Sequence, residues 1–499
     1  MSIAKKITGQ AGIYFAGTLF SVAIGFFFKI YISKELGADM LGIYALGMTV
    51  VTILSVFLSL GLGNGLVRFV SKYIAQENYT QLHTYLRKTL SITVMMSVIS
   101  ASLFFIIPDI IAGTLLNSPE LTPYLPYFGV LLFINAIITL CDQTIRGLQE
   151  VRKSTLIGHF IRLPLKIAIA VGFITIGYQL EGYIWAEIIG AIVALGLFFG
   201  LIKKLLPKQM PKLTLKPSTL ITKEERTFGN NMLLINTIGL LQGQGDKIVL
   251  AIYLTTTDLG IYSIALTLTA FVPTILLSVN AIFTPIISQL HTEKRMQELK
   301  KYYQASCKYI FVLTIPLIVF LIVFNQPMLN VFGEEFKLGG QVLILLLIAQ
   351  VINTSTGSVG MMLNMTGLER VSRNSAIIIA VLSIIGYLLL IPKYGLIGIG
   401  ITKLVVVLVQ SGYAVFMLYS KQHIQPFNMS YVKIIIVFLI SAFAYYYLGE
   451  GTLDDLAHPL WLFVGLCVTY LIFVSLFLVF SAKEDRQFIK SLMNKSVKA

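Results

Sequence analysis

Long apolar segments recur along the whole chain, and short stretches with charged residues, proline, glycine or asparagine separate them. A helix needs roughly 20 mostly apolar residues to cross about 30 Å of hydrocarbon. Fourteen segments reach that length, near residues 10–32, 40–63, 88–108, 123–142, 156–177, 181–202, 229–253, 260–284, 306–325, 339–362, 374–391, 395–418, 431–449 and 460–481. Only 12% of the residues are charged, about half the proportion in soluble domains. The sequence therefore predicts an all-α polytopic membrane protein with about 14 transmembrane helices.

Lysine and arginine concentrate in alternate loops. If the N-terminus is cytoplasmic, the basic stretches at residues 5–6, 203–226 and 483–498 all lie on the cytoplasmic side. The loops of the opposite side contain acids such as Glu334 and Asp454 and few basic residues. This asymmetry matches the positive-inside rule. It predicts that both termini are cytoplasmic, and it accounts for the formal net charge of +15 without a nucleic-acid partner.

Three short motifs occur twice in the same order, separated by 216–220 residues. The pairs are LGIY at 41–44 and 259–262, GLQEVRK at 147–153 and GLERVSR at 367–373, and YQLEG at 178–182 and YGLIG at 394–398. Each pair takes the same place in a series of six predicted helices. Because six is an even number, both copies insert in the same orientation, as in parallel-repeat carriers. The sequence thus predicts two parallel six-helix repeats.

The repeats divide the chain into four parts. Residues 1–202 form the expected N-terminal six-helix bundle, and residues 203–228 form a basic, proline-containing cytoplasmic linker. Residues 229–420 form the expected second six-helix bundle. Residues 421–499 supply two extra transmembrane helices and a cytoplasmic tail.

Two lysines inside predicted helices are the principal candidates for a substrate site. Placing a charge at the centre of a membrane helix costs about 2.5–3.5 kcal/mol on insertion scales, so such charges usually face a protein interior or a hydrated cavity. The 218-residue offset of the LGIY motif aligns Lys29 with Lys247, so both repeats carry a lysine at the same depth. We interpret this pair as point charges that hold an anionic substrate group. The alternative is that both side chains reach lipid headgroups from the outer ends of their helices.

Three further basic residues complete the predicted substrate-binding set. Arg162 and Lys166 are four residues apart and share one helix face, with Pro164 between them. Arg68 follows the second predicted helix. The alternative for Arg162 and Lys166 is a topological role near the cytoplasmic surface.

Three charged residues are candidates for gating or ion coupling. Asp246 precedes Lys247 and is either a proton or cation site or a counter-ion at a helix end. The third repeated motif aligns Glu187 with Lys403, which suggests a pair between the repeats. The alternative is that these two residues pair with other helices.

Enzyme chemistry is not indicated. The chain has neither a nucleophile motif nor a phosphate-binding loop, and its three cysteines stand far apart without a metal-ligand pattern. We therefore expect no catalytic residue, no cofactor and no metal site, and we expect transport driven by an ion gradient, the membrane potential or the substrate's own gradient.

A family resemblance adds to this interpretation. The segment from Gly12 to Leu46, with Lys29 and the first LGIY, and the stretch RFVSKY at 68–73 resemble bacterial polysaccharide and lipid-linked oligosaccharide flippases of the O-antigen and capsule type. These belong to the multidrug/oligosaccharidyl-lipid/polysaccharide exporter superfamily. The similarity extends over essentially the whole chain and includes the turns at Gly147 and Gly367.

The resemblance implies a V-shaped pair of six-helix bundles that moves a polyprenyl-diphosphate-linked glycan from the inner to the outer leaflet of the bacterial inner membrane. It implies that Lys29 and Lys247 meet the diphosphate, and that membrane lipids and glycan-assembly proteins such as a polymerase are partners. The O-antigen type would further place the chain in lipopolysaccharide biosynthesis. Two alternatives stay open: a drug or cation antiporter of the same superfamily, and a non-transporting scaffold of a glycan-assembly complex.

Overall fold

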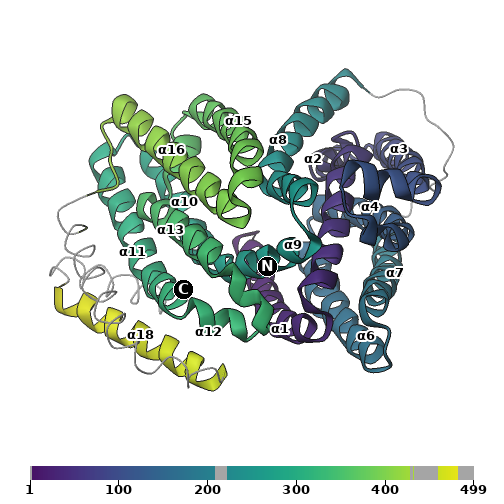
Figure 1. The fold of residues 1–499 in the computed structure, drawn as a ribbon. Coiled ribbons are helices and arrows are strands. Elements are labelled where there is room, and N and C mark those ends of the chain that lie inside the picture. The colour runs from purple at the N-terminus through teal and green to yellow at the C-terminus, as the bar shows by residue number, and fades with distance from the viewer. Residues whose placement is uncertain (1–2, 208–221, 428–430, 432–458, 481–499) are drawn as a thin grey trace. The chain divides into compact units, whose positions relative to one another are not determined.

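The computed structural model describes residues 3–207, 222–427, 431 and 459–480, and within these ranges the regular structure is entirely helical (Figure 1). The chain separates into two compact units, Met1–Gly260 and Ile261–Ala499. The first unit contains α1 (Ile3–Leu58), α2 (Leu62–Ala75), α3 (Tyr79–Ile106), η1 (Ile110–Leu115), η2 (Pro119–Tyr124), α4 (Leu125–Gly147), α5 (Val151–Thr155), η3 (Leu156–Arg162), α6 (Leu163–Thr175), α7 (Gln179–Leu205) and α8 (Lys223–Tyr253). Helix α9 (Thr256–Thr269) contains the boundary. The second unit contains α10 (Phe271–Thr292), α11 (Met296–Val323), α12 (Asn325–Asn330), η4 (Glu334–Gly339), α13 (Gly340–Thr356), α14 (Val359–Met365), α15 (Glu369–Tyr394), α16 (Leu396–Gln422) and α18 (Pro459–Phe480).

The chain is a multi-pass, all-α membrane protein, as the apolar segments predict. Among the described residues, ten helical stretches are long and apolar enough to cross a membrane. One of them, Gly12–Leu58, contains two predicted spans, because the φ of 73° at Gly37 interrupts the α-helical backbone inside α1. Glycine suits this position because it has no Cβ to oppose a positive φ. The total of 14 helices stays a prediction, since nearly all of the segment 431–449 lies outside the described residues.

Helix α8 differs from the other long helices in its polarity. It has 31 residues but is not among the ten apolar stretches, because amide and charged side chains interrupt its apolar ones. Its N-terminus has a capping box, in which Thr222 accepts a hydrogen bond from the Glu225 backbone and Glu225 accepts one from the Thr222 backbone. This device satisfies N–H groups that the first turn leaves without partners.

The predicted domain boundaries stay a prediction. Helices α7 and α8 flank the expected linker, of which residues 208–221 lie outside the described residues. Helix α8 packs against α1 and α2, and for this reason the compact units divide after Gly260. The sequence duplication assigns α8 to the second six-helix bundle, whereas its packing against α1 and α2 assigns it to the first unit. The predicted tail and part of the predicted C-terminal pair also lie outside the described ranges.

The order and length of helices repeat along the chain. Helices α3 and α11 have 28 residues each, and α7 and α16 have 27 each. A six-residue 3₁₀ helix directly precedes α4 in the first case (η2) and α13 in the second (η4). These equal lengths support the internal duplication that the three motifs predict.

The glycines of the two LGIY motifs, Gly42 and Gly260, both lie in the first unit at a close approach of two backbone segments. A Cβ on Gly42 would lie 1.7 Å from the carbonyl oxygen of Thr256, and a Cβ on Gly260 would lie 1.8 Å from that of Ala38. Thr256 also donates a hydrogen bond from its hydroxyl to Asp39. The motif glycines therefore mark a backbone crossing too close for a side chain, which gives the repeated glycine a physical reason.

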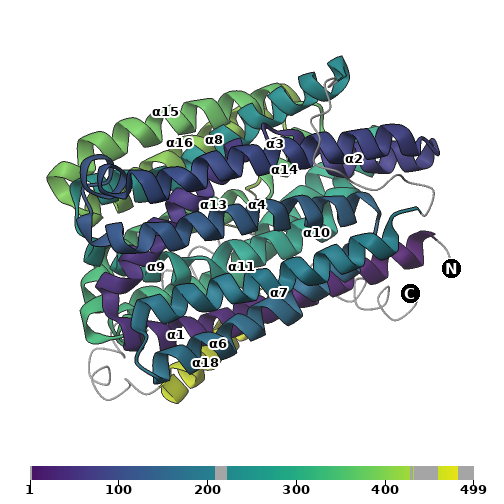
Figure 2. The same cartoon turned by 90° about the vertical axis from the view of Figure 1, so that its right-hand side faces the viewer.

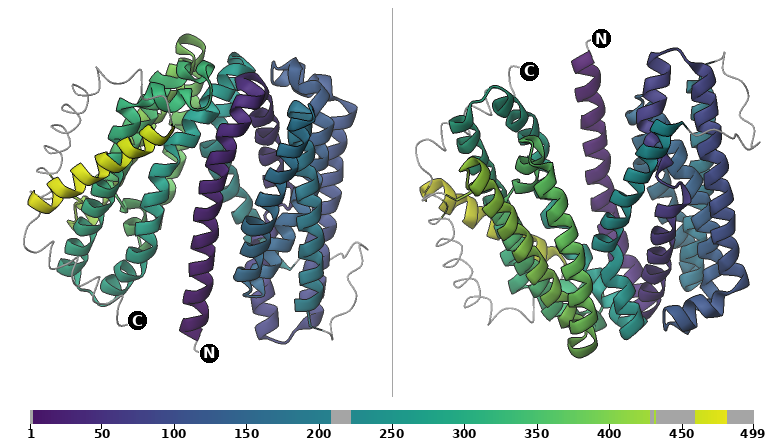
Figure 3. Two further views of the ribbon diagram at one scale, coloured as in Figure 1. Left: turned by 90° about the horizontal axis from the view of Figure 1, so that it is seen from below. Right: turned by 90° about the horizontal axis from the view of Figure 1, so that it is seen from above.

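Each unit has its own layers of packed helices. In the first unit α4 packs against both α3 and α7, and the three run alongside one another (Figure 2). In the second unit α13 packs against α11 and α16, and α15 packs against α16. Helix α18 crosses α11 obliquely (Figure 3).

Candidate functional site

A buried carboxylate connects three elements of the first unit. The side chain of Glu187 on α7 is 8% exposed. Its Oε1 lies 3.2 Å from Nη2 of Arg162 in η3, and its Oε2 pairs with Nζ of Lys166 on α6. Arg162 also donates a 2.8 Å hydrogen bond to Oδ1 of Asn135 on α4. The two basic residues predicted to share a helix face thus both reach one carboxylate.

Aromatic rings enclose this ion-pair cluster. Tyr44, the tyrosine of the first LGIY motif, donates a 3.2 Å hydrogen bond to Oε2 of Glu187. Its ring lies 4.3 Å from that of Tyr183, measured between centroids. Lys166 Nζ lies 5.1 Å from the centroid of the Tyr183 ring, within the range of a cation–π contact. The rings exclude water from one side of the charges, which strengthens their electrostatic interactions.

Lys29 and Lys247, the aligned lysines of the two repeats, both belong to the first unit. Lys29 on α1 is half-buried and interacts electrostatically with both Lys166 and Lys247. Within the described part of the chain, no hydrogen bond or ion pair engages the Lys29 ammonium. Lys247 on α8 donates a 2.9 Å hydrogen bond to Oε1 of Gln244. Like charges repel, so an anion that entered this region would relieve a repulsion already present.

Asp246 lies beside Lys247 and is almost fully buried, with 1% of its surface exposed. Its Oδ1 accepts a 2.9 Å hydrogen bond from the backbone N–H of Lys247. Together, Lys29, Lys247, Arg162 and Lys166 outnumber the two carboxylates near them. We call these four residues the cationic cluster. The arrangement favours an anion with more than one negative charge.

Arg68 is placed away from the cationic cluster. It lies on α2, where its Nη2 is 3.0 Å from Oε1 of Glu224 at the start of α8, and it stacks over the Phe228 ring. Lys72 Nζ is 2.8 Å from Oε2 of the same carboxylate. The hydrogen bond from Lys72 and the charges of Lys72 and Arg68 lower the pKa of Glu224. Arg68 thus contributes to the attachment of α8 to α2, and its binding of substrate stays a prediction.

Lys403 lies in the second unit, on α16, with its Nζ 5.7 Å from the centroid of the Tyr387 ring. The predicted pair of Glu187 with Lys403 stays a prediction. Glu187 has its ion pairs with Arg162 and Lys166, partners that the sequence did not assign to it.

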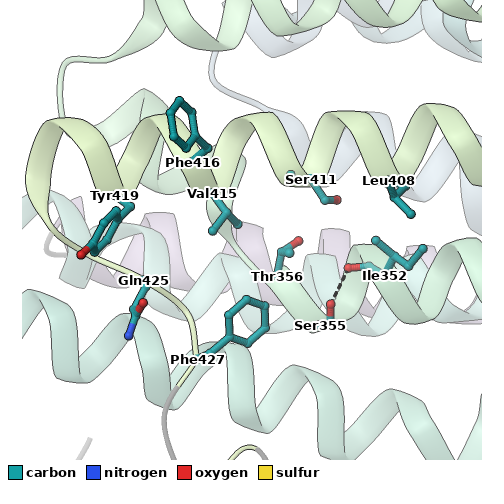
Figure 4. A pocket seen from close by; sticks show the side chains of 11 residues that line it. Ile352, Ser355, Thr356, Leu408, Ser411, Val415, Phe416, Tyr419, Gln425 and Phe427 are labelled. Atoms are coloured by element: carbon teal, nitrogen blue, oxygen red, sulfur yellow. Dashed lines mark hydrogen bonds between the residues drawn. The ribbon is translucent and has the colours of Figure 1, made fainter.

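The second unit contains a cavity of about 510 Å³ between α13, α16 and the segment that follows α16 (Figure 4). Its walls include Ile352, Ser355, Leu408, Phe416 and Phe427. No charged residue lines it, and none of the predicted site residues contributes to it. The cavity therefore lacks the cations that an anionic group requires.

Sequence reasoning missed Tyr44, Tyr183 and Asn135 as neighbours of the charges. Tyr44 had a signal, because it belongs to the LGIY motif, but the motif alone does not say what a tyrosine contacts. Tyr183 and Asn135 are single residues in apolar helices, where no local pattern distinguishes a polar contact from ordinary packing.

The fold is that of polytopic transporters. Structural comparison finds similarity to the lipid II flippase MurJ in an inward closed conformation, with a TM-score of 0.71 and 16% identity over 95% of this chain and 99% of that one. An inward-facing multidrug resistance MATE family transporter of the MOP superfamily has a TM-score of 0.65 and 18% identity, over 82% and 95% of the two chains. At such identities the likeness defines the fold alone.

The family follows from the sequence itself. The model of the family described as polysaccharide biosynthesis protein matches residues 36–337, and the chain belongs to this family. The probable low-salt glycan biosynthesis flippase Agl15 of Haloferax volcanii is 21% identical over 387 residues, which is 77% of each chain.

Proposed function

We propose that the chain is a flippase that translocates a polyprenyl-diphosphate-linked oligosaccharide from the inner to the outer leaflet by alternating access. The cationic cluster is the single observation that carries this proposal. Four basic side chains from α1, η3, α6 and α8, all elements of the first unit, make up this cluster. The diphosphate is the part of such a lipid that hydrocarbon rejects most strongly.

The surroundings of the cluster support the assignment of Lys29 and Lys247 to the diphosphate. Both side chains are half-buried, and Lys29 experiences the charges of Lys166 and Lys247 without a carboxylate partner among the described residues. A role limited to lipid headgroups would not require basic residues from different helices to converge. Arg162 and Lys166 extend the same anion site, and Arg68 on α2 is a further proposed substrate contact.

Coupling to an ion gradient is part of the proposal. Asp246, Glu187 and Lys403 are the proposed gating or coupling residues, and Asp246 is the proposed site for a proton or another cation. We further propose that both termini are cytoplasmic, that the membrane is a bacterial inner membrane, and that glycan-assembly proteins such as a polymerase receive the product. O-antigen synthesis, within lipopolysaccharide biosynthesis, is the proposed use of the glycan.

A drug or cation antiporter is the second candidate, and the likeness to a MATE transporter favours it. A cationic drug requires acidic groups at its site. The two carboxylates near the cluster are buried, and Glu187 is already paired with two basic residues. This balance of charge favours the anionic lipid.

Removal of the gene from its native strain tests the proposed function. We expect the strain to accumulate a prenyl-diphosphate-linked oligosaccharide on the cytoplasmic leaflet, identified by mass spectrometry after extraction, and we expect the wild-type gene to reverse the accumulation. A strain that makes no lipid-linked glycan would instead support the scaffold of a glycan-assembly complex. A strain with unchanged lipid-linked glycan and altered drug resistance would support the antiporter.

A further inference from the structure

Glu187 is engaged through both of its carboxylate oxygens. Its two carboxylate oxygens form ion pairs with Arg162 of η3 and Lys166 of α6 and accept a hydrogen bond from the Tyr44 hydroxyl of α1. Little of the side chain is exposed, and the side chains of Arg162 and Lys166 are only 22% and 16% exposed. Burying an unpaired charge costs free energy, so Glu187 and its two basic partners stabilise one another.

The same carboxylate competes with any anion that enters the cationic cluster. Arg162 and Lys166 have donors that suit phosphate as well as they suit a carboxylate. Lys29 interacts electrostatically with Lys166 as well as with Lys247. A diphosphate held by Lys29 and Lys247 would therefore be drawn toward the cations that Glu187 neutralises.

We propose that Glu187 is a resident counter-ion that occupies Arg162 and Lys166 while the site is empty, and that the substrate's diphosphate displaces it. This inference rests on the proposed function. The carboxylate keeps the empty carrier stable, because it pairs two buried cations that would otherwise be unpaired. It also weakens substrate binding, because part of the binding free energy is used to break the ion pairs of Glu187. Weaker binding permits release after translocation. Transport needs binding strong enough for entry and weak enough for exit.

Tyr44 is a positioning residue in this mechanism. Its hydroxyl donates to Glu187 Oε2, the oxygen that also pairs with Lys166. It lies two residues from Gly42, which contacts the start of α9 at the LGIY crossing. A change at this crossing would alter the position of the Tyr44 hydroxyl and with it the orientation of Glu187.

Binding of geranylgeranyl diphosphate to purified protein in detergent, measured by isothermal titration calorimetry, tests the inference. Glu187→Gln keeps the shape and removes the charge, so its Kd should fall at least about tenfold relative to wild type, the equivalent of one charge-assisted hydrogen bond. Its turnover in proteoliposomes should fall as well, because release becomes slow. Glu181→Gln is the matched control, since Glu181 is exposed in the first turn of the same helix and should leave both quantities unchanged.

The outcomes separate this inference from the proposed function. If wild-type protein does not bind the prenyl diphosphate, the proposed function is wrong. If wild-type protein binds it and folded Glu187→Gln binds equally or more weakly, only the counter-ion role is contradicted. If Glu187→Gln does not fold, Tyr44→Phe replaces it. That variant keeps the carboxylate charged but removes one hydrogen bond to it, and it should bind the ligand more tightly than wild type, whereas unchanged or weaker binding contradicts the inference.

Discussion

Replacement of both Lys29 and Lys247 by alanine is expected to abolish delivery of lipid-linked glycan to the outer leaflet. Each ammonium supplies charge-assisted contacts worth about 1.5–3 kcal/mol, so each single variant should reduce the translocation rate by about 10- to 150-fold. Arginine at either position keeps the positive charge and should retain more activity than alanine. The measurement is the amount of outer-leaflet lipid-linked glycan in cells, at matched expression of each variant.

Lys34→Ala and Lys223→Ala are the matched controls for these substitutions. Lys34 is an exposed residue five positions after Lys29 on α1, and Lys223 is the exposed first residue of α8. Both should transport at the wild-type rate. Full transport by the Lys29/Lys247 double variant would contradict the cationic site and would favour a role for these lysines at lipid headgroups.

Replacement of Gly42 by alanine is expected to destabilise the protein through the LGIY crossing. The added Cβ would lie 1.7 Å from the carbonyl oxygen of Thr256 and 2.5 Å from its carbon, so the two backbones must move apart. Overpacking of this kind costs about 1–3 kcal/mol. The thermal midpoint of the purified protein in detergent should fall, and transport should fall with it, because Tyr44 lies two residues further along α1 and donates a hydrogen bond to Glu187.

Gly25→Ala provides the matched control within α1. A Cβ on Gly25 would have no atom within 4 Å, so this substitution should leave the thermal midpoint unchanged or slightly higher, given alanine's better helix propensity. A Gly42→Ala protein as stable as Gly25→Ala would show that the crossing is looser than its geometry indicates.

Hydrophobicity and duplication made most of the fold predictable. A membrane span is a local property of about 20 residues, so the apolar segments correspond to helices throughout the described chain. The LGIY repeat indicated the duplication, but the close approach of its two glycines became evident only in the structure. The apolar run at 229–253 predicted a span where the structure has α8, but the amide and charged side chains of this helix keep it out of the ten stretches that are apolar enough to cross a membrane.

The partners of the buried charges were harder to predict. The four-residue spacing predicted that Arg162 and Lys166 share one helix face, and the 218-residue offset predicted that Lys29 and Lys247 occupy equivalent positions. The contact of Glu187 with Arg162 and Lys166 depends on how α7 packs against η3 and α6, which no local pattern encodes. Repeat symmetry relates equivalent positions, but ion pairs form between whichever side chains the packing brings together.

The most direct test of the account measures leaflet exchange by the purified protein. A prenyl-diphosphate-linked oligosaccharide is incorporated into proteoliposomes, with and without an imposed ion gradient, and a membrane-impermeant glycosidase reports how much of it is accessible from outside. The account predicts that wild-type protein makes nearly all of the lipid accessible, while vesicles containing the Lys29/Lys247 double variant expose only the outer-leaflet fraction. Wild-type vesicles that behave like protein-free vesicles under every gradient would contradict the account.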